Sequence, residues 1–118
     1  MYHQIVKFWF EETNPEQWWK KDEIFDALLL ERFAEMHGRA SRGELFEWRE
    51  HPEGRLAEII ILDQFSRNMF RDTPLAFATD PMSLALSQEA ISSGADQVLT
   101  PVQRSFLYMP FMHSESLQ

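Results

Sequence analysis

The stretch that decides the fold runs from Leu56 to Arg71 and reads LAEIIILDQFSRNMFR. Its first half is apolar almost all round, which is typical of a helix buried on most sides. At about 100° per residue, the polar side chains of the second half share one arc with Leu56 and Ile60. The spacing predicts a helix over 53–71, with one face that changes from apolar to strongly polar. The polar residues of this arc are Asp63, Gln64, Arg67, Asn68 and Arg71.

Two interpretations of this polar arc are open. It forms either a solvated outer face at the end of a buried helix or a polar pocket within a mostly apolar bundle. Phe65, Met69 and Phe70 occupy the remaining faces and leave less room for open solvent, which favours the pocket. Asp63 and Arg67 have the four-residue spacing of an ion pair within one helix.

Arg32 stands in the middle of a predicted apolar stripe. Ile24, Leu28 and Met36 follow one another at four- and eight-residue steps, and Arg32 continues the same series. An Arg in this place either extends its charge to the edge of the core or meets a buried carboxylate. We expect Asp63 to be that carboxylate. The alternatives are Glu31, Glu35 and Glu58.

Helix-start signals recur along the chain and predict an all-α fold in a single domain, residues 1–118. Asn14, Asp80 and Thr100 are capping residues that each precede a Pro, which the first helical turn accepts. Gly38 follows a probable helical stretch, as expected of a residue that tolerates a left-handed C-cap. Sustained alternation of apolar and polar residues is absent. The predicted helices span 2–11, 22–37, 43–50, 53–71, 81–93 and 101–109, with short turns near 15–20 and 74–78.

The C-terminal segment contains a candidate acid or base. Pro110 is expected to kink or stop the last helix near Met109, because proline lacks the backbone donor and clashes with the preceding turn. His113 follows this break. A His among aromatic residues is more often packed and hydrogen-bonded than catalytic, but it can exchange protons when a carboxylate orients its ring. Glu115 and Asp63 are the candidate carboxylates.

Composition excludes several classes of function. The chain has 118 residues, a net charge of −8 and no Cys. The acidic excess argues against nucleic-acid binding, and no apolar run is long enough to span a membrane. The lack of Cys excludes disulfides and thiolate sites, so we expect the reducing cytoplasm. The His residues lack zinc-ligand spacing and the Gly residues are not clustered, so neither a metal nor another cofactor is expected.

Several sequence words resemble a bacterial family known only as domain of unknown function 924, which is placed in the tetratricopeptide-like helical superfamily. The most specific are LDQFSRN, residues 62–68, and YMPFMHSE, residues 108–115. Shorter words at 8–10, 15–18 and 77–80 share the resemblance. It implies an all-helical fold of antiparallel hairpins and supplies no substrate or reaction.

The resemblance also bears on completeness. Proteins of this kind normally continue past the HSE word with further helices. The chain is therefore expected to be most of a longer family domain, either truncated or a natural short form. An apolar face left by missing helices would need a covering partner, for example a second copy in a homo-oligomer.

Four hypotheses of function follow. The first is a pocket for a small anionic molecule or peptide carboxylate, with Asp63 orienting one of the Arg side chains. The second is a hydrolase-type enzyme that uses His113 as general acid and base, tuned by Glu115 or Asp63. The third is a protein-interaction scaffold, and the fourth is a buried ion network with a purely structural role. The candidate ligand-binding residues of the first hypothesis are Arg32, Gln64, Arg67, Asn68 and Arg71.

Overall fold

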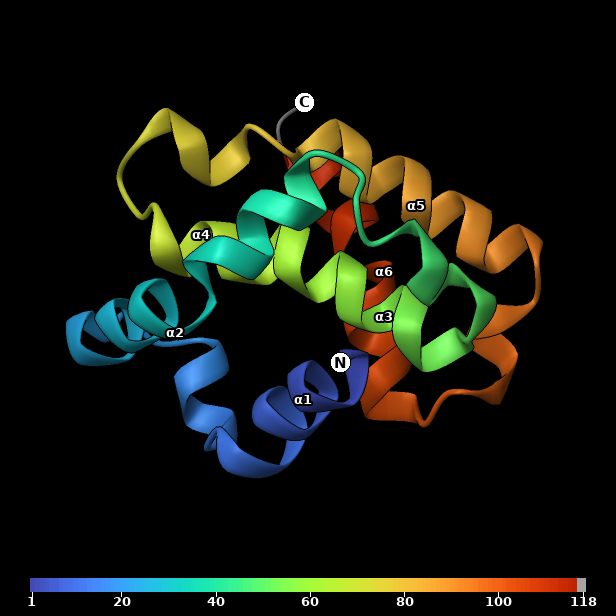
Figure 1. The fold of residues 1–118 in the computed structure, drawn as a ribbon, viewed down its shortest axis with the longest axis horizontal. Helices are drawn as coiled ribbons and strands as arrows, with labels where there is room; N and C mark the ends of the chain where they lie inside the picture. The colour runs from blue at the N-terminus through green and yellow to red at the C-terminus, as the bar shows by residue number, and fades with distance from the viewer. Residues whose placement is uncertain (117–118) are drawn as a thin grey trace.

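The computed structural model describes residues 1–116 and is built of α-helices joined by short turns (Figure 1). No strand occurs within these residues, so the predicted all-α class is confirmed. None of the helices in this part of the chain combines the length and the apolar character that crossing a membrane requires. The α-helices are α1 Tyr2–Lys7, α2 Glu23–Ser41, α3 Pro52–Ile60, α4 Ser66–Met69, α5 Asp80–Ser92 and α6 Pro101–Ser116.

Short 3₁₀ and π turns continue or connect these helices. The turns predicted near 15–20 and 74–78 are 3₁₀ turns. The helix predicted over 43–50 is only a 3₁₀ turn in its second half, because Gly43 has the left-handed φ of 75° and interrupts the helical path. The 3₁₀ turns are Pro15–Trp18, Phe46–Glu50, Pro74–Phe77 and Ala95–Val98, and the π turns are Phe8–Glu12 and Ile61–Phe65.

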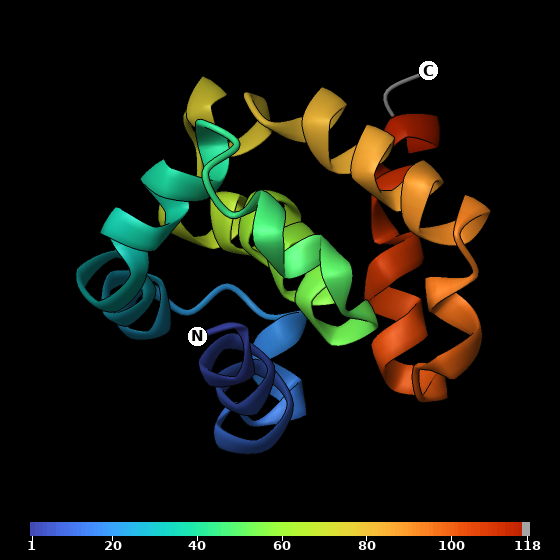
Figure 2. The ribbon, with the colours of Figure 1, turned by 45° about the vertical axis from the view of Figure 1, so that its right-hand side comes forward.

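A continuous helical rod from Pro52 to Met69 forms the centre of the molecule. It consists of α3, the π turn Ile61–Phe65 and α4, and the other helices surround it (Figures 1 and 2). Helix α1 packs against α3, α2 packs against α4, and α5 and α6 cover the opposite side. The helix predicted over 53–71 is therefore present over 52–69 and mostly buried, and the π turn interrupts its regular α-helical geometry.

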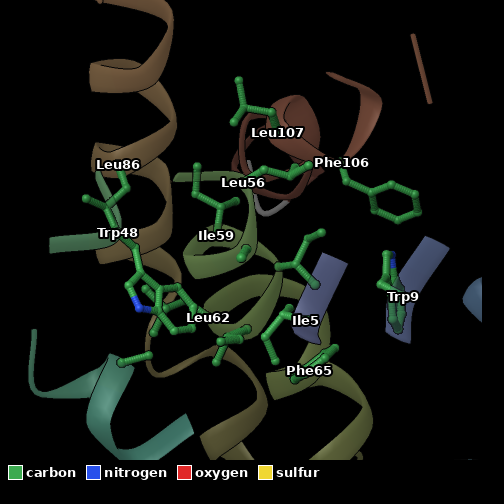
Figure 3. Packing of buried hydrophobic residues seen from close by; sticks show 14 of the residues in the cluster. Ile5, Trp9, Trp48, Leu56, Ile59, Leu62, Phe65, Leu86, Phe106 and Leu107 are labelled. Carbon is green, nitrogen blue, oxygen red and sulfur yellow. The ribbon is translucent and has the colours of Figure 1, made fainter. Parts of the chain in front are cut away.

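Apolar side chains of the rod make the core. Leu56, Ile59, Leu62 and Phe65 are fully buried and meet side chains from the surrounding elements (Figure 3). The ring centroid of Phe65 lies 5.6 Å from that of Trp9. Such tilted and edge-to-face aromatic pairs stabilise a core beyond the area that they bury. The buried rod fixes the position of the polar segment that follows it.

Helix α2 differs from its prediction in length and in orientation. It continues through Gly38 to Ser41, because Gly38 stays in helical geometry. Its buried face carries Phe25, Leu29 and Phe33, whereas Ile24 on the predicted apolar stripe is 85% exposed. The stripe that contains Arg32 is therefore the outer edge of the apolar face and not its middle.

Helix α6 also departs from its prediction, since it does not stop at Met109 but runs through Pro110 to Ser116. Proline at position 110 lacks the N–H that would donate to the carbonyl of Phe106, four residues earlier. The hydroxyl of Ser87 on α5 donates a hydrogen bond to the carbonyl of Leu107 in the same part of the helix and ties α6 to α5. The helix continues past the proline and carries His113 within its last turns.

Two of the three predicted capping residues cap their helices, and the third does not. Asn14 and Thr100 each form a capping box with the Gln three residues later. At the start of α5 the N-cap position belongs to Thr79, and Asp80 is already the first helical residue. The prediction that Asp80 caps the helix is wrong, because its carboxylate is engaged elsewhere.

Candidate functional site

Asp63 is a buried carboxylate at the centre of the site. It lies in the π turn and is 1% exposed. Its Oδ1 accepts a hydrogen bond from Arg67 Nη1 at 3.1 Å, and its Oδ2 accepts one from Gln64 Nε2 at 3.0 Å. A buried carboxylate needs such partners to offset its desolvation. Because π turns are frequent at functional sites, this position marks Asp63 as a candidate.

His113 completes the contacts of Asp63. The His113 Nδ1 lies 2.8 Å from Asp63 Oδ1, although the two residues are fifty positions apart in the sequence. An ionised carboxylate can only accept a hydrogen bond, so a neutral imidazole in this contact carries its proton on Nδ1. Nε2 is then the ring nitrogen that accepts a proton. The structure therefore brings the predicted acid–base residue to one of its two predicted carboxylates.

Glu115, the other predicted carboxylate, is exposed on α6. It lies two residues beyond His113, near the end of the helix. The imidazole contacts Asp63, at 2.8 Å.

Arg67 links Asp63 to a further carboxylate, that of Asp80. Its Nη1 and Nη2 donate to Asp80 Oδ1 and Oδ2, both at 2.9 Å, in the bidentate geometry that suits a guanidinium. The Phe77 ring centroid lies 5.4 Å from Arg67 Cζ, a cation–π distance. Asp63, Arg67, Asp80 and His113 are called the His113 cluster below.

A cavity of about 350 Å³ adjoins the His113 cluster. It lies between the start of α5 and the C-terminal half of α6, which Figures 1 and 2 show beside each other. Asp80 belongs both to the cluster and to the wall of this cavity. The lining residues are Phe77, Asp80, Pro81, Leu84, Pro110 and Ser114.

The rest of the predicted polar arc forms a second group. Asn68 Nδ2 donates to Asp26 Oδ1 at 2.9 Å, and Arg71 Nε donates to Asp26 Oδ2 at 2.7 Å. The hydrogen bond to Asp26 raises the pKa of Arg71. Asp26, Asn68 and Arg71 are called the Asp26 cluster below, and they line a recess of about 250 Å³ with Lys21 and Asp72.

The predicted arc is therefore buried but divided. Asp63, Gln64 and Asn68 are each less than a tenth exposed, so the solvated-face interpretation is wrong for them. Arg67 turns toward Asp63 and Asp80, whereas Arg71 turns toward Asp26 on α2.

Arg32 lies apart from both clusters, and the expectation that it meets Asp63 is wrong. Its guanidinium lies 5.0 Å from the ring centroids of Phe8 and Phe33, and its Nη1 is 3.5 Å from Glu12 Oε1. Since its stripe lies at the edge of the apolar face, the side chain reaches solvent over aromatic rings. Glu58, an alternative partner, instead accepts two hydrogen bonds from Arg49.

Sequence reasoning missed Asp80, Phe77 and Asp26 as members of these groups. Asp80 looked like a helix cap, and its pairing with Arg67 is a tertiary contact. The sequence does contain a signal for these two residues, because Phe77 and Asp80 are the first and last residues of the short family word at 77–80. Within residues 1–116, no three His, Asp or Glu side chains gather closely enough to hold a metal ion.

Comparison with known proteins places the chain among proteins without an assigned reaction. Among curated proteins, none is significantly similar to it. A solved structure from Agrobacterium tumefaciens, a protein of unknown function called ATU0120, is 41% identical and superposes with a TM-score of 0.90. The similarity covers 95% of this chain and 63% of that one. The family described as bacterial protein of unknown function (DUF924) matches residues 5–118, and the chain belongs to this family.

Proposed function

We propose that this protein is a hydrolase-type enzyme in which His113 is the general acid and base and Asp63 orients its imidazole. The observation that carries the proposal is the 2.8 Å contact between His113 Nδ1 and the buried Asp63 Oδ1 beside a cavity. An imidazole held by a carboxylate through Nδ1 is the arrangement that many unrelated hydrolases use to move a proton.

His113 Nε2 accepts a proton from water while the water oxygen attacks the electrophilic atom of the substrate. The imidazolium formed is stabilised by Asp63, and it returns the proton to the leaving group when the bond to that group breaks. Arg67 holds Asp63 in place through its 3.1 Å contact, so it acts as a positioning residue.

The anion-binding hypothesis has less support. Arg67 donates to two carboxylates, and Arg71 donates to Asp26. Arg32 lies away from both clusters, beside Glu12. The guanidinium groups that were expected to bind an anion are thus each matched by a carboxylate of the protein itself.

A purely structural ion network explains the pairing of Arg67 with its carboxylates, but it does not require a partly exposed titratable ring against the buried Asp63. His113 retains a quarter of its side-chain exposure, whereas Asp63 is buried. A buried carboxylate next to a partly exposed imidazole favours an acid–base role for His113 over a purely structural one.

The test is hydrolysis of a panel of chromogenic substrates that includes p-nitrophenyl butyrate, p-nitrophenyl phosphate and a p-nitroanilide. His113→Gln is expected to lower kcat/KM by about 10²-fold or more on whichever substrate the wild type hydrolyses. His3→Gln is the matched control: it changes an exposed His near the N-terminus and is expected to keep the wild-type rate. The proposal fails when the wild type hydrolyses none of the panel, or when the two variants are equally active.

A further inference from the structure

The cavity beside His113 has apolar walls. Phe77 closes one side, Pro81 and Leu84 come from α5, and Pro110 comes from α6. At about 350 Å³, it lies near the lower end of the range for small-molecule pockets. A compact apolar group fits these walls better than a long or strongly hydrated one.

The cavity reaches the His113 cluster through Asp80, which lines the cavity and accepts hydrogen bonds from Arg67. Pro110 and Ser114, which also line it, lie on either side of His113 in the sequence of α6. Phe77 packs against the guanidinium of Arg67, which in turn holds Asp63. A molecule in the cavity is therefore next to the His113 cluster.

The charge of the site disfavours an anionic substrate. With a neutral imidazole, Asp63 and Asp80 contribute two negative charges and Arg67 one positive charge, so the His113 cluster is net negative. The guanidinium of Arg67 faces both carboxylates. Asp80 is the charged residue in the cavity lining, so an incoming anion meets a carboxylate first.

We infer, on the basis of the proposed function, that the substrate is an electrically neutral carboxylic ester whose compact apolar part occupies this cavity. Water attacks the ester carbonyl carbon as His113 Nε2 takes its proton, and the carbonyl π electrons move to the carbonyl oxygen. The carbonyl then re-forms, the bond to the alkoxide breaks, and the alkoxide receives the proton from the imidazolium. One water is consumed, and a carboxylic acid and an alcohol are released.

The binding part of this inference is tested without catalysis. 2-Pentanone is a neutral analogue of a small ester that cannot be hydrolysed, and butyrate is an anion of similar size. Titration of the full chain, followed by ¹H–¹⁵N correlation spectra, is expected to show 2-pentanone shifting the resonances of the cavity lining. Butyrate is expected to bind at least about 10-fold more weakly.

Two substitutions on α5 supply matched variants. Leu84→Trp fills the cavity and is expected to abolish the shifts caused by 2-pentanone, whereas Ile91→Trp alters an exposed position on the same helix and retains them. Where Leu84→Trp does not fold, Phe77→Ser tests the same wall at a residue that is 52% exposed. Equal binding by the two Trp variants, or butyrate binding as tight as that of 2-pentanone, overturns the inference.

Catalysis separates this inference from the proposed function. The wild type is expected to hydrolyse p-nitrophenyl butyrate with a kcat/KM at least about 10²-fold above that for p-nitrophenyl phosphate. His113→Gln is expected to lose hydrolysis and still bind 2-pentanone. Hydrolysis of the butyrate ester that does not depend on His113 contradicts the proposed function alone. Preference for the phosphate ester, with His113 still required, contradicts the substrate class alone.

Discussion

The His113 cluster and the Asp26 cluster come from the same short stretch of sequence but differ in what surrounds them. Each pairs an Arg of the DQFSRNMFR segment with an Asp from elsewhere in the chain. The His113 cluster adds an imidazole and the buried Asp63, and it opens on a cavity with apolar walls. The Asp26 cluster adds an amide and faces a recess lined with charged residues. An Arg–Asp pair is thus common to both, and the imidazole and cavity distinguish the candidate site.

Burial also separates the two clusters. The side chain of Asp63 is 1% exposed and that of Asp26 is 14% exposed. The cost of removing a carboxylate that accepts hydrogen bonds grows with its burial, because the donors that it leaves behind have no water to bond instead. The two clusters are therefore expected to respond differently to the same substitution.

The largest expected effect is on stability. Asp63→Asn removes the buried carboxylate that accepts hydrogen bonds from Arg67 and Gln64 and contacts His113, and we expect it to lower the free energy of unfolding by about 3 kcal/mol. Asp26→Asn acts on a more exposed pair and is expected to cost about 1 kcal/mol. Urea unfolding of both variants measures the difference. Equal losses contradict the contrast between the clusters.

A smaller effect is expected from His37, a buried imidazole whose Nε2 lies 2.7 Å from Ser66 Oγ. Burial lowers the pKa of His37 below 6.5, so the folded state holds it neutral while the unfolded chain takes up a proton. Its contribution to stability is therefore complete above pH 6.5 and declines as the pH falls below that value. Urea unfolding of wild type and His37→Gln at several pH values tests this. The free energy of unfolding of the variant should fall less than that of the wild type as the pH is lowered. An unchanged pH dependence would show that this ring is not responsible.

A smaller effect is expected from added anions, which test whether the Arg side chains of the two clusters can bind a ligand. Because Arg67 and Arg71 are matched by carboxylates, phosphate and citrate are expected to shift the Tm of the wild type and of Arg67→Ala by similar amounts, within about 1 °C. Thermal unfolding with each anion measures this. Stabilisation of several degrees in the wild type that Arg67→Ala lacks supports the anion pocket instead.

The smallest effect is expected at Glu115. Glu115→Gln changes an exposed residue near the end of α6 and should alter the free energy of unfolding by less than about 0.5 kcal/mol. Hydrolysis of p-nitrophenyl butyrate should also stay at the wild-type rate. A strong loss of hydrolysis assigns the orienting role to Glu115 rather than Asp63.

Periodicity predicts the features that depend on neighbours along one helix. The burial of the rod from Pro52 to Met69 follows from the apolar first half of LAEIIILDQFSRNMFR, and the polar arc follows from its second half. The sequence also indicates His113 as a candidate acid and base, and it offers two carboxylates to orient the ring, Asp63 and Glu115.

Tertiary contacts account for what periodicity did not predict. Asp80 carries an ordinary helix-start signal in the sequence. Its carboxylate joins the His113 cluster only because Arg67, thirteen residues earlier, lies opposite in the fold. Helix α6 continues past Pro110, because the loss of one backbone donor does not by itself end a helix that packs against its neighbours α3 and α5. Arg32 was misplaced because a stripe at the edge of an apolar face has the same spacing as one at its centre.

The proposed chemistry depends on Asp63 holding His113 in the tautomer that can accept a proton on Nε2. Long-range ¹H–¹⁵N correlation spectra of the imidazole, recorded at about pH 8 where an ordinary His is neutral, measure the tautomer directly. We expect His113 to carry its proton on Nδ1 in the wild type and Asp63→Asn to shift the population toward the Nε2-protonated form. A wild-type ring protonated on Nε2, or a tautomer that does not respond to Asp63→Asn, contradicts this expectation.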